Sequence, residues 1–424
     1  MRVAFLLPLL VLAGTASAQE TVLLRGAKVF TGTGAFQDGV EVLLQGGKIA
    51  KVGPSITPPA GAKVLELEGR WLTPGLVDPN TSLGLDQAHV NEESDEVTPH
   101  IPILEAVSPR DQSFRRALED GVTTAYVSPG GKNVFGGLGV VLKTQGETLA
   151  KRVLDRGNGM RMTLGSMPTA GNRTFRGGNP DSMFYRRPTT RMGVIWEIRS
   201  AFYDADARRA SGDREELEDD PKVKTLIAAL DQKLVVRTTA RTDQDIRTAL
   251  RLAQEFGLKL ALDECTEAWL NLDQLAAAGF PVICAPPSVE THPDNAEPHL
   301  DTIKLLADKG VKVAIQTGQG LGALPLIREA AFAVRRGLPR ERALEAVTSV
   351  PADILGVADR VGRIAEGLDA DLVVWNLHPL SVFSKAETVI VDGFFVIRPA
   401  QAEGSPALES AGTAPPSENR GTRL

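Results

Sequence analysis

The chain carries few side chains of the types that bind a transition metal. Its 424 residues include two cysteines and five histidines. Two cysteines are too few for a zinc cluster or a disulfide scaffold. The histidines, whose number limits any imidazole-based metal site, are His89, His100, His292, His299 and His378.

Two groups of histidines offer candidates for a cation site. His292 and His299 lie in a proline-rich stretch that is expected to be a loop, where a paired ligand role competes with a surface loop carrying incidental histidines. His89 and His100 flank the acidic segment 91–96, whose carboxylates could hold a cation. Acidic runs are more often a solvated face, so neither group predicts a metal centre by itself.

Asp263 and Glu264 are the adjacent carboxylates that are the candidates for catalysis. Two carboxyl groups can act as general acid and base if their surroundings separate their pKa values. Their oxygens would suit Mg²⁺ or Ca²⁺ rather than zinc. Adjacent strand residues point to opposite sides, so only one of the two can face a common site. The simpler interpretation is a solvated strand end that caps the next turn.

Other reaction types and partner classes are poorly supported. The chain has no Gly-x-Ser-x-Gly elbow and no Gly-x-x-x-x-Gly-Lys-Ser/Thr phosphate loop. Cys265 as a nucleophile would need a nearby histidine, and the sequence suggests none. The formal net charge of −6 argues against a nucleic acid or an anionic membrane surface as a partner.

The segments that would position these residues alternate between strand and helix patterns. Thr242 and Asp245 resemble a capping box that opens a helix, and Gly257 closes it. Four strands and four helices in about a hundred residues predict half of a parallel barrel. An open doubly wound sheet is the alternative, but no Gly-x-Gly-x-x-Gly follows a strand. The strands are expected at 234–237, 258–262, 282–285 and 311–315, and the later helices at 270–278, 299–309 and 323–336.

The two ends of the chain have a different character. Residues 21–64 consist of short apolar strand patterns separated by glycine turns, and residues 371–375 and 387–397 repeat this pattern. These pieces are too small to stand alone, so they are expected to pair in one small β domain.

The extreme termini predict processing and disorder. Residues 1–18 have a positive start, a short apolar stretch and a small-x-small site, which predicts a signal peptide cut after Ala18 and an exported, periplasmic or secreted protein. Residues 399–424 predict a disordered tail. An oxidising destination would allow Cys265 and Cys284 to pair, although neighbouring strands often miss disulfide geometry, and the question stays open.

Several ordered motifs resemble the amidohydrolase superfamily, and its exported, imidazolonepropionase-like branch in particular. Residues 69–78 (GRWLTPGLVD) are similar to the segment that enters the barrel in that family. The closing half is similar over 342–356, 362–375 and 391–393, and the interior over 121–124, 133–139 and 191–193. The resemblance covers residues 20–398, and the correct order of separate motifs makes it specific.

The resemblance implies an α/β fold, a (β/α)8 TIM-type barrel with a small composite β-sandwich formed by both terminal segments. The expected domains are a signal peptide at 1–18, a sandwich of 19–70 and 361–398, a barrel of 71–360, and a tail at 399–424. The family hydrolyses non-peptide carbon–nitrogen bonds at the C-terminal mouth of the barrel. One or two divalent metals such as zinc activate a water there, held by a His-x-His pair, two further histidines and an aspartate.

The chain departs from that pattern at every matched ligand position. These positions hold Asn80, Ser82, Thr239, Glu264 and Gly318. We therefore expect no metal cofactor and a degenerate member with little or no metal-dependent activity. Asp263 and Glu264 remain the only weak catalytic candidates.

Three roles stay open on this basis. The first is a binding or scaffolding subunit that partners an active amidohydrolase relative, or that forms a homo-oligomer. The second is an active hydrolase with an unorthodox carboxylate site. The third is an exported binder of a small-molecule ligand that uses the former active-site mouth as a pocket.

Overall fold

The computed structural model describes residues 20–86, 88, 90–157, 159–170, 172, 186–211, 219–289, 293–318 and 324–398. The predicted signal peptide at 1–18 and the predicted tail at 399–424 lie outside these residues, as do His89 and His292. Within the described ranges, no helix has both the length and the apolar character needed to cross a membrane.

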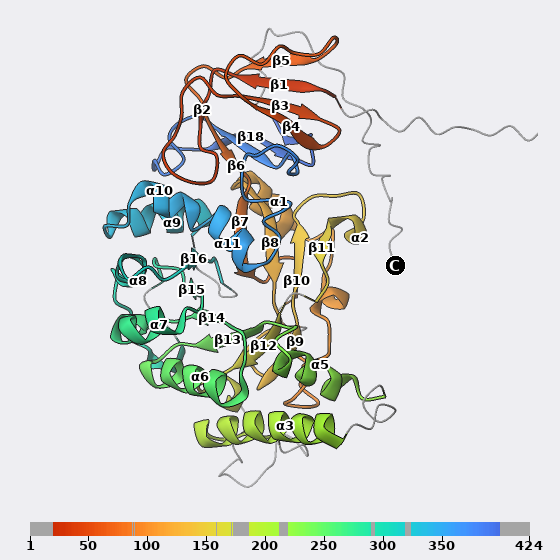
Figure 1. Ribbon diagram of the computed structural model, residues 1–424, viewed down its shortest axis with the longest axis vertical. Helices are drawn as coiled ribbons and strands as arrows, with labels where there is room; N and C mark the ends of the chain where they lie inside the picture. The colour runs from red at the N-terminus through yellow and green to blue at the C-terminus, as the bar shows by residue number, and fades with distance from the viewer. Residues whose placement is uncertain are drawn as a thin grey trace, which may run out of the picture.

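Strands from the two ends of the chain gather at one end of the molecule (Figure 1). Their two sheets share a core that includes Leu24, Leu44, Leu72 and Leu372. One sheet has the order β4 (Lys48–Gly53), β3 (Glu41–Gln45), β1 (Val22–Arg25) and β5 (Lys63–Glu66). The other has the order β19 (Phe394–Ile397), β18 (Ala386–Val391), β17 (Leu372–Trp375), β6 (Trp71–Pro74) and β2 (Lys28–Val29).

A six-stranded sheet forms one wall of the larger α/β part. Five of its strands are parallel, and β9 at its edge is antiparallel to β12. The order is β16 (Val313–Ile315), β15 (Val282–Cys284), β14 (Leu260–Glu264), β13 (Val236–Ala240), β12 (Met160–Thr163) and β9 (Phe135–Leu138). The helices that follow β13 to β16 in turn are α6 (Asp243–Phe256), α7 (Leu272–Ala278), α8 (Thr302–Asp308) and α9 (Leu326–Arg335). The predicted alternation of four strands and four helices is confirmed.

The helix ends lie where the predicted capping residues place them. The side chain of Thr242 accepts a hydrogen bond from the backbone N–H of Asp245 at 3.2 Å, as a helix N-cap does. Gly257 and Gly279 end α6 and α7 in the left-handed conformation, with φ of 65° and 70°. The strands β13 and β14 start two residues later and end two or three residues later than predicted, because the polar residues Thr238, Thr239, Asp263 and Glu264 stay paired in the sheet.

A second, four-stranded sheet completes the α/β part. Its order is β11 (Val153–Asp155), β10 (Val140–Lys143), β8 (Val122–Val127) and β7 (Leu76–Thr81). The strands β7 and β8 are parallel, whereas β10 and β11 are antiparallel to their neighbours. Thr81 and Gly318 form a parallel bridge, which joins the end of β7 to the segment after β16.

The fold is α/β and resembles a TIM barrel, but its strands form two mixed sheets instead of one uniform eight-stranded barrel. The strands β9 and β10, joined at Gly139, are inserted between β8 and β12 and give both sheets their antiparallel strands. A Cβ at Gly139 would lie 2.1 Å from the Tyr126 hydroxyl oxygen, so only glycine allows this close approach.

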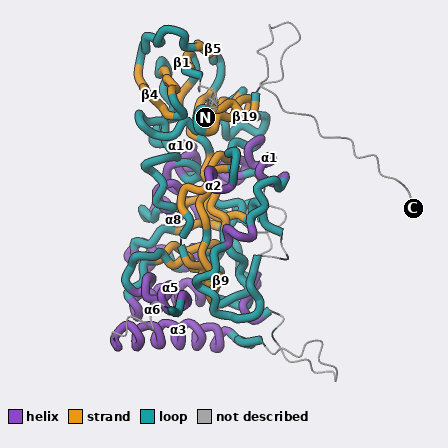
Figure 2. Tube along the Cα trace, turned by 90° about the vertical axis from the view of Figure 1, so that its right-hand side faces the viewer, coloured by secondary structure: helices purple, strands orange, loops and turns teal. Residues whose placement is uncertain are grey.

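The remaining helices cover the outside of the sheets and one end of the molecule. The helix α3 lies at the end opposite the terminal strands, as both views show (Figures 1 and 2). Its Met192, Trp196 and Tyr203 are exposed. The remaining helices of this part of the molecule are α1 (Gln112–Glu119), α2 (Leu149–Arg152), α3 (Arg191–Ser211), α5 (Pro221–Leu230), α10 (Arg340–Glu345) and α11 (Ser349–Ile354).

A buried lysine links the α/β part to the terminal strands. Lys143 on β10 is 1% exposed, and its Nζ lies 2.7 Å from Asp369 and 3.1 Å from Asp371 and also contacts Asp392. Burial opposes ionisation of Asp369, but hydrogen bonds from Arg360 and Lys143 lower its pKa to about 2. Burial raises the pKa of Asp371 to about 6, against the attraction of Lys143. One ammonium group therefore holds three carboxyl groups at this junction.

Candidate functional site

Charged and hydroxyl side chains line one face of three neighbouring strands. Arg161 pairs in register with Arg237, Thr163 with Thr239, and Thr239 with Asp263. Registered neighbours in a sheet point to the same face. Each of the five side chains is at most 1% exposed. We call Arg161, Thr163, Arg237, Thr239 and Asp263 the polar layer.

The contacts of Arg237 show that the polar layer faces the interior between the two sheets. Its Nη2 donates to Asp263 Oδ1 at 2.7 Å, and its Nε donates to Asp263 Oδ2 at 3.2 Å. The same Nη2 donates to the carbonyl of Pro79 on β7 at 2.8 Å. The guanidinium carbon lies 4.3 Å from the ring centroid of Tyr126 on β8. Burial opposes the charge, yet Asp263 keeps the pKa of Arg237 above its usual value.

Arg161 is a buried guanidinium without a carboxylate partner. Its Nη1 donates to the hydroxyl of Ser128 at 2.8 Å, while its Nε is buried and unpartnered. Among the residues that the structure describes, none places a carboxylate within ion-pair distance of it. Burial lowers the pKa of Arg161. Five further buried atoms of this region have no hydrogen-bond partner within the described ranges: Thr163 Oγ1, Thr239 Oγ1, Arg237 Nη1, Asn80 Oδ1 and Gln316 Oε1.

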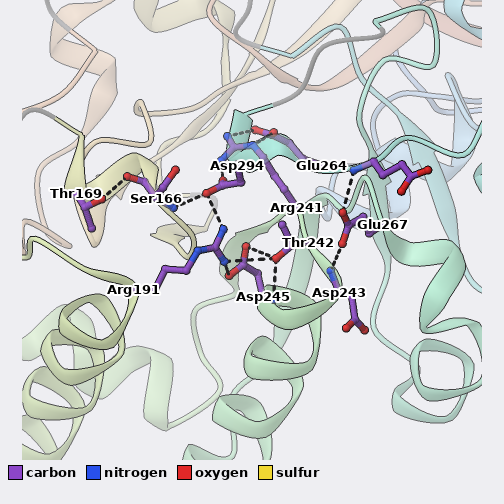
Figure 3. A network of polar contacts seen from close by, with 11 residues as sticks. Ser166, Thr169, Arg191, Arg241, Thr242, Asp243, Asp245, Glu264, Glu267 and Asp294 are labelled. Carbon is purple, nitrogen blue, oxygen red and sulfur yellow. Dashed lines mark hydrogen bonds and ion pairs between the residues drawn. The ribbon is translucent and has the colours of Figure 1, made fainter.

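A second set of charges lies at the carboxyl ends of β13 and β14 (Figure 3). Arg241 binds both carboxylate oxygens of Glu264, with Nη2 to Oε1 at 2.9 Å, and reaches Asp294 at 3.3 Å. Arg191 on α3 binds Asp294 at 2.8 Å and also contacts Asp245. We call these five residues the arginine–carboxylate network.

The arginine–carboxylate network connects five segments by ion pairs. These segments are α3, the residue after β13, α6, the end of β14 and the 293–295 turn. Asp294, whose side chain is fully buried, lies in the 293–295 turn after β15. It also accepts a hydrogen bond from the backbone N–H of Ser166, which follows β12, at 2.6 Å. Burial opposes the charge of Arg241, but Glu264 and Asp294 raise its pKa above the usual value. All three carboxylates are therefore engaged by arginines.

The two candidate carboxylates point to opposite sides, as the strand geometry predicts. Asp263 faces the polar layer and is fully buried, so the interpretation as a solvated strand end is wrong for this residue. Glu264 has a φ of 73° and turns toward Arg241 at the strand end. Each carboxylate accepts two hydrogen bonds from one arginine, which leaves neither free as a simple acid or base.

The five matched ligand positions do not form a metal site in this structure. Asn80 is buried near the end of β7, and its carbonyl accepts from the N–H of Gly318 at 3.0 Å. Thr239 lies in the polar layer, Glu264 binds Arg241, and Ser82 follows β7. Within the described ranges, no group of three or more His, Cys, Asp or Glu residues is arranged to hold a metal ion. The guanidiniums of Arg161 and Arg237 would also repel a divalent cation, so the donor set does not fit the family's metal.

The described histidines, which do not include His89 and His292, have surroundings of their own. His299 packs against Trp269, with ring centroids 5.1 Å apart. His378 packs against Phe36 and Trp71 of the terminal strands. His100 has a buried Nδ1 without a partner.

Two carboxylates of the acidic segment 91–96 form ion pairs with lysines of the protein. Glu93 pairs with Lys132 at 2.7 Å, and Asp95 pairs with Lys222 at 3.1 Å. These carboxylates therefore already have cationic partners.

The two cysteines are free thiols, and both are buried. Burial raises the pKa of Cys284 to about 12 and also raises that of Cys265, with the nearby Cys284 adding to the effect. A thiol with a raised pKa is a poor nucleophile at neutral pH.

The sequence interpretation missed the arginines of this site. Arg161 lies between Met160 and Met162, and Arg237 follows Val235 and Val236. A charged residue inside a short apolar strand run is the signal that could have found both, because such a residue must be paired inside the fold or face a polar interior.

Asp78 on β7 predicts a pH dependence of stability. Its carboxylate is buried and accepts from Thr317, through the hydroxyl and the backbone N–H, and from the N–H of Asn80. Burial raises its pKa from 3.8 to about 6. The folded state therefore binds this proton more tightly than the unfolded state does. The stabilisation is complete below pH 3.8 and is lost as the pH rises through about 6.

We expect this carboxyl group to reduce the free energy of unfolding by about 3 kcal/mol between acid and neutral pH. Urea unfolding at a series of pH values, with the wild type and Asp78→Asn compared at each pH, measures the effect. The wild type should lose stability relative to the variant as the pH rises from 4 to 7. A difference that is constant over this range would contradict the assignment.

The fold and the site together define a class of protein. An α/β, TIM-barrel-like chain with polar side chains at the carboxyl ends of its parallel strands has the architecture of small-molecule enzymes and binders. Residues 220–397 match the profile described as "Amidohydrolase family".

Comparison with known proteins gives the family. A solved amidohydrolase from Thermotoga maritima is similar, with a TM-score of 0.80 and 33% identity over 89% of this chain and 100% of that one. Amidohydrolase tasK of Hapsidospora irregularis is 30% identical over 83% of this chain but only 39% of its own length. An imidazolonepropionase of Stenotrophomonas maltophilia is 24% identical over 90% of this chain and 95% of its own. The chain belongs to the amidohydrolase superfamily, and this confirms the resemblance read from its motifs.

Proposed function

We propose that this chain is a degenerate amidohydrolase with little or no metal-dependent activity, whose polar layer binds a small molecule. One observation carries the proposal. Of the positions where the family's metal ligands are expected, Thr239 lies in the polar layer with two buried arginines, and Glu264 is bound by Arg241. The adjacent Asp263 is bound by Arg237.

Electrostatics supports the loss of the metal. The charge of Asp263 is balanced by Arg237, and Arg161 adds a further buried positive charge to the same layer. Like charges repel strongly inside a protein, because the effective dielectric constant is far below that of water. A divalent cation would have to displace both guanidinium groups or bind against the repulsion from their positive charges.

The rival role, an active hydrolase with a carboxylate site, has less support. A general base must be able to reach and accept a proton from a water molecule. Asp263 and Glu264 each use both oxygens to accept N–H groups of an arginine. Either residue would have to leave its partner before it could act.

Organisation and location complete the proposal. We propose that the two mixed sheets are one interrupted (β/α)8 barrel of residues 71–360, beside a composite β-sandwich of residues 19–70 and 361–398. Hydrogen bonds from Val77 to Val347 and from Ile315 to Ala346 support the barrel, since segment 346–347 lies between β16 and β7. Export after cleavage behind Ala18, and association with an active relative or a second copy, belong to the same proposal.

The metal content of the purified, exported protein tests the proposed function. We expect zinc, manganese and iron well below one equivalent per chain by inductively coupled plasma mass spectrometry. Added zinc should not increase hydrolysis of cyclic amides or imides. A zinc metalloenzyme carried through the same buffers controls for metal loss during purification.

Near-stoichiometric metal with metal-dependent turnover would contradict the proposal. Metal-independent turnover that is lost in Asp263→Asn or Glu264→Gln, with the fold intact, would instead support the carboxylate hydrolase.

A further inference from the structure

We propose that the polar layer binds a small monocarboxylate, which pairs with Arg161. This inference deepens the proposed function and rests on it, because the ligand would occupy the interior from which the metal has been lost. The argument uses the unpartnered donors of the layer, their shared face and the balance of charge.

Four potential donors of the polar layer have no hydrogen-bond partner among the residues that the structure describes. They are Arg161 Nε, Arg237 Nη1 and the hydroxyl groups of Thr163 and Thr239. Leaving a buried donor unsatisfied costs about 1–3 kcal/mol, so native proteins rarely gather several of them. A bound acceptor would satisfy them together.

The strand register places these donors together. Arg161 and Thr163 alternate along β12, and Arg237 and Thr239 stand beside them on β13. The intervening Thr238 is also buried, but it points to the other face and its hydroxyl contacts the carbonyl of Val236 at 3.5 Å. On β12 and β13, the unpartnered hydroxyls are thus those on the interior face.

The charge balance favours a ligand with a single negative charge. Arg237 and Asp263 form a neutral pair, so Arg161 leaves one net positive charge in the polar layer. A carboxylate neutralises this charge, whereas a phosphate dianion would exceed it. Carboxylate oxygens also match the planar donor geometry of a guanidinium.

The neighbouring arginines and amide side chains do not change the expected charge of the ligand. The guanidiniums of Arg191 and Arg241 are already bound by the carboxylates of the arginine–carboxylate network. Asn80 and Gln316 present unpartnered oxygens, and each belongs to an amide whose nitrogen donates when the group is turned.

Titration of the full-length protein with sodium acetate, in the presence of a chelator, tests the inference. Thermal unfolding and isothermal calorimetry follow binding at constant ionic strength, with sodium phosphate and sodium chloride as comparison anions. We expect acetate to bind saturably and to raise the midpoint of unfolding, and the other two anions to do so less. Absence of saturable acetate binding, or stronger binding of phosphate, would overturn the proposal.

Two threonine variants locate the site. Thr163→Val with Thr239→Val removes two hydroxyl donors that have no partner in the described part of the chain, so no hydrogen bond of that part is lost at either position. We expect acetate to bind about tenfold more weakly or worse. Arg161→Met should abolish binding, and Thr238→Val is the matched control that should bind as the wild type does. Unchanged binding in the double threonine variant would overturn the assignment.

Two separate measurements, acetate binding and metal-dependent turnover, distinguish failure of this inference from failure of the proposed function. Failure of acetate to bind a protein that has no metal-dependent turnover would remove this inference and leave the proposed function standing. Metal-dependent turnover by a protein that binds acetate would remove the proposed function instead.

Discussion

Replacement of Lys143 by methionine is expected to lower the free energy of unfolding by about 3–5 kcal/mol, because it leaves the buried carboxyl group of Asp371 without its cation. Lys143 is 1% exposed and pairs with Asp369, Asp371 and Asp392. Asp369 keeps Arg360 and Lys48 as partners, whereas Asp371 already has one buried oxygen without a partner. Equilibrium unfolding in urea at pH 7 measures the loss.

An exposed lysine provides the control for this prediction. Lys151 on α2 pairs with Glu147 four residues earlier at the surface, so Lys151→Met should change the stability by less than about 1 kcal/mol. The combination of Lys143→Met with Asp371→Asn should recover part of the lost stability. Equal effects of Lys143→Met and Lys151→Met would show that the junction does not depend on the buried ammonium.

Arg237→Met alone is expected to cost a similar amount, about 3–5 kcal/mol, because Asp263 would remain charged and unpaired in the interior. The double variant Arg237→Met with Asp263→Leu should be much closer to the wild type, since well-packed apolar residues often replace a buried ion pair without loss. Urea unfolding of both single variants and the double variant gives the coupling energy between the two side chains.

A surface pair of the same geometry is the control for this cycle. Arg199 also binds both oxygens of Glu255, at 2.7 to 3.1 Å, but its side chain is 41% exposed. Arg199→Met should therefore cost less than about 1 kcal/mol. If Arg237→Met proved as mild as Arg199→Met, the polar layer would be hydrated and the electrostatic argument against a metal would weaken.

The helices and the order of elements could be predicted because local chemistry decides them. Thr242 and Gly257 set the two ends of α6 within a single stretch of chain. The predicted strand ends were less accurate, because hydrophobicity was the guide and the C-terminal halves of β13 and β14 contain the polar residues Thr238, Thr239, Asp263 and Glu264. The insertion of β9 and β10 depends on the contact between Gly139 and Tyr126, which no local pattern announces.

The candidate site divides in the same way. Alternation along a strand correctly separated Asp263 from Glu264, and the missing histidines were visible directly. The arginine partners of both carboxylates were not visible, since Arg237 lies 26 residues before Asp263 and Arg241 lies 23 residues before Glu264. Contacts across such separations depend on the assembled sheets, so the sequence named the carboxylates but not the arginines that bind them.

The pairing of β6 with β17 has a consequence for the order in which the chain folds. Thr73 on β6 accepts a hydrogen bond from the indole of Trp375 on β17, 302 residues later. Closing a loop of this length costs several kcal/mol of chain entropy, and many other contacts must form before that cost is offset. During synthesis, β1, β3, β4 and β5 can pair with one another as they emerge, whereas β6 must wait for the ribosome to deliver β17. An early strand of the chain is therefore among the last to reach all of its native partners.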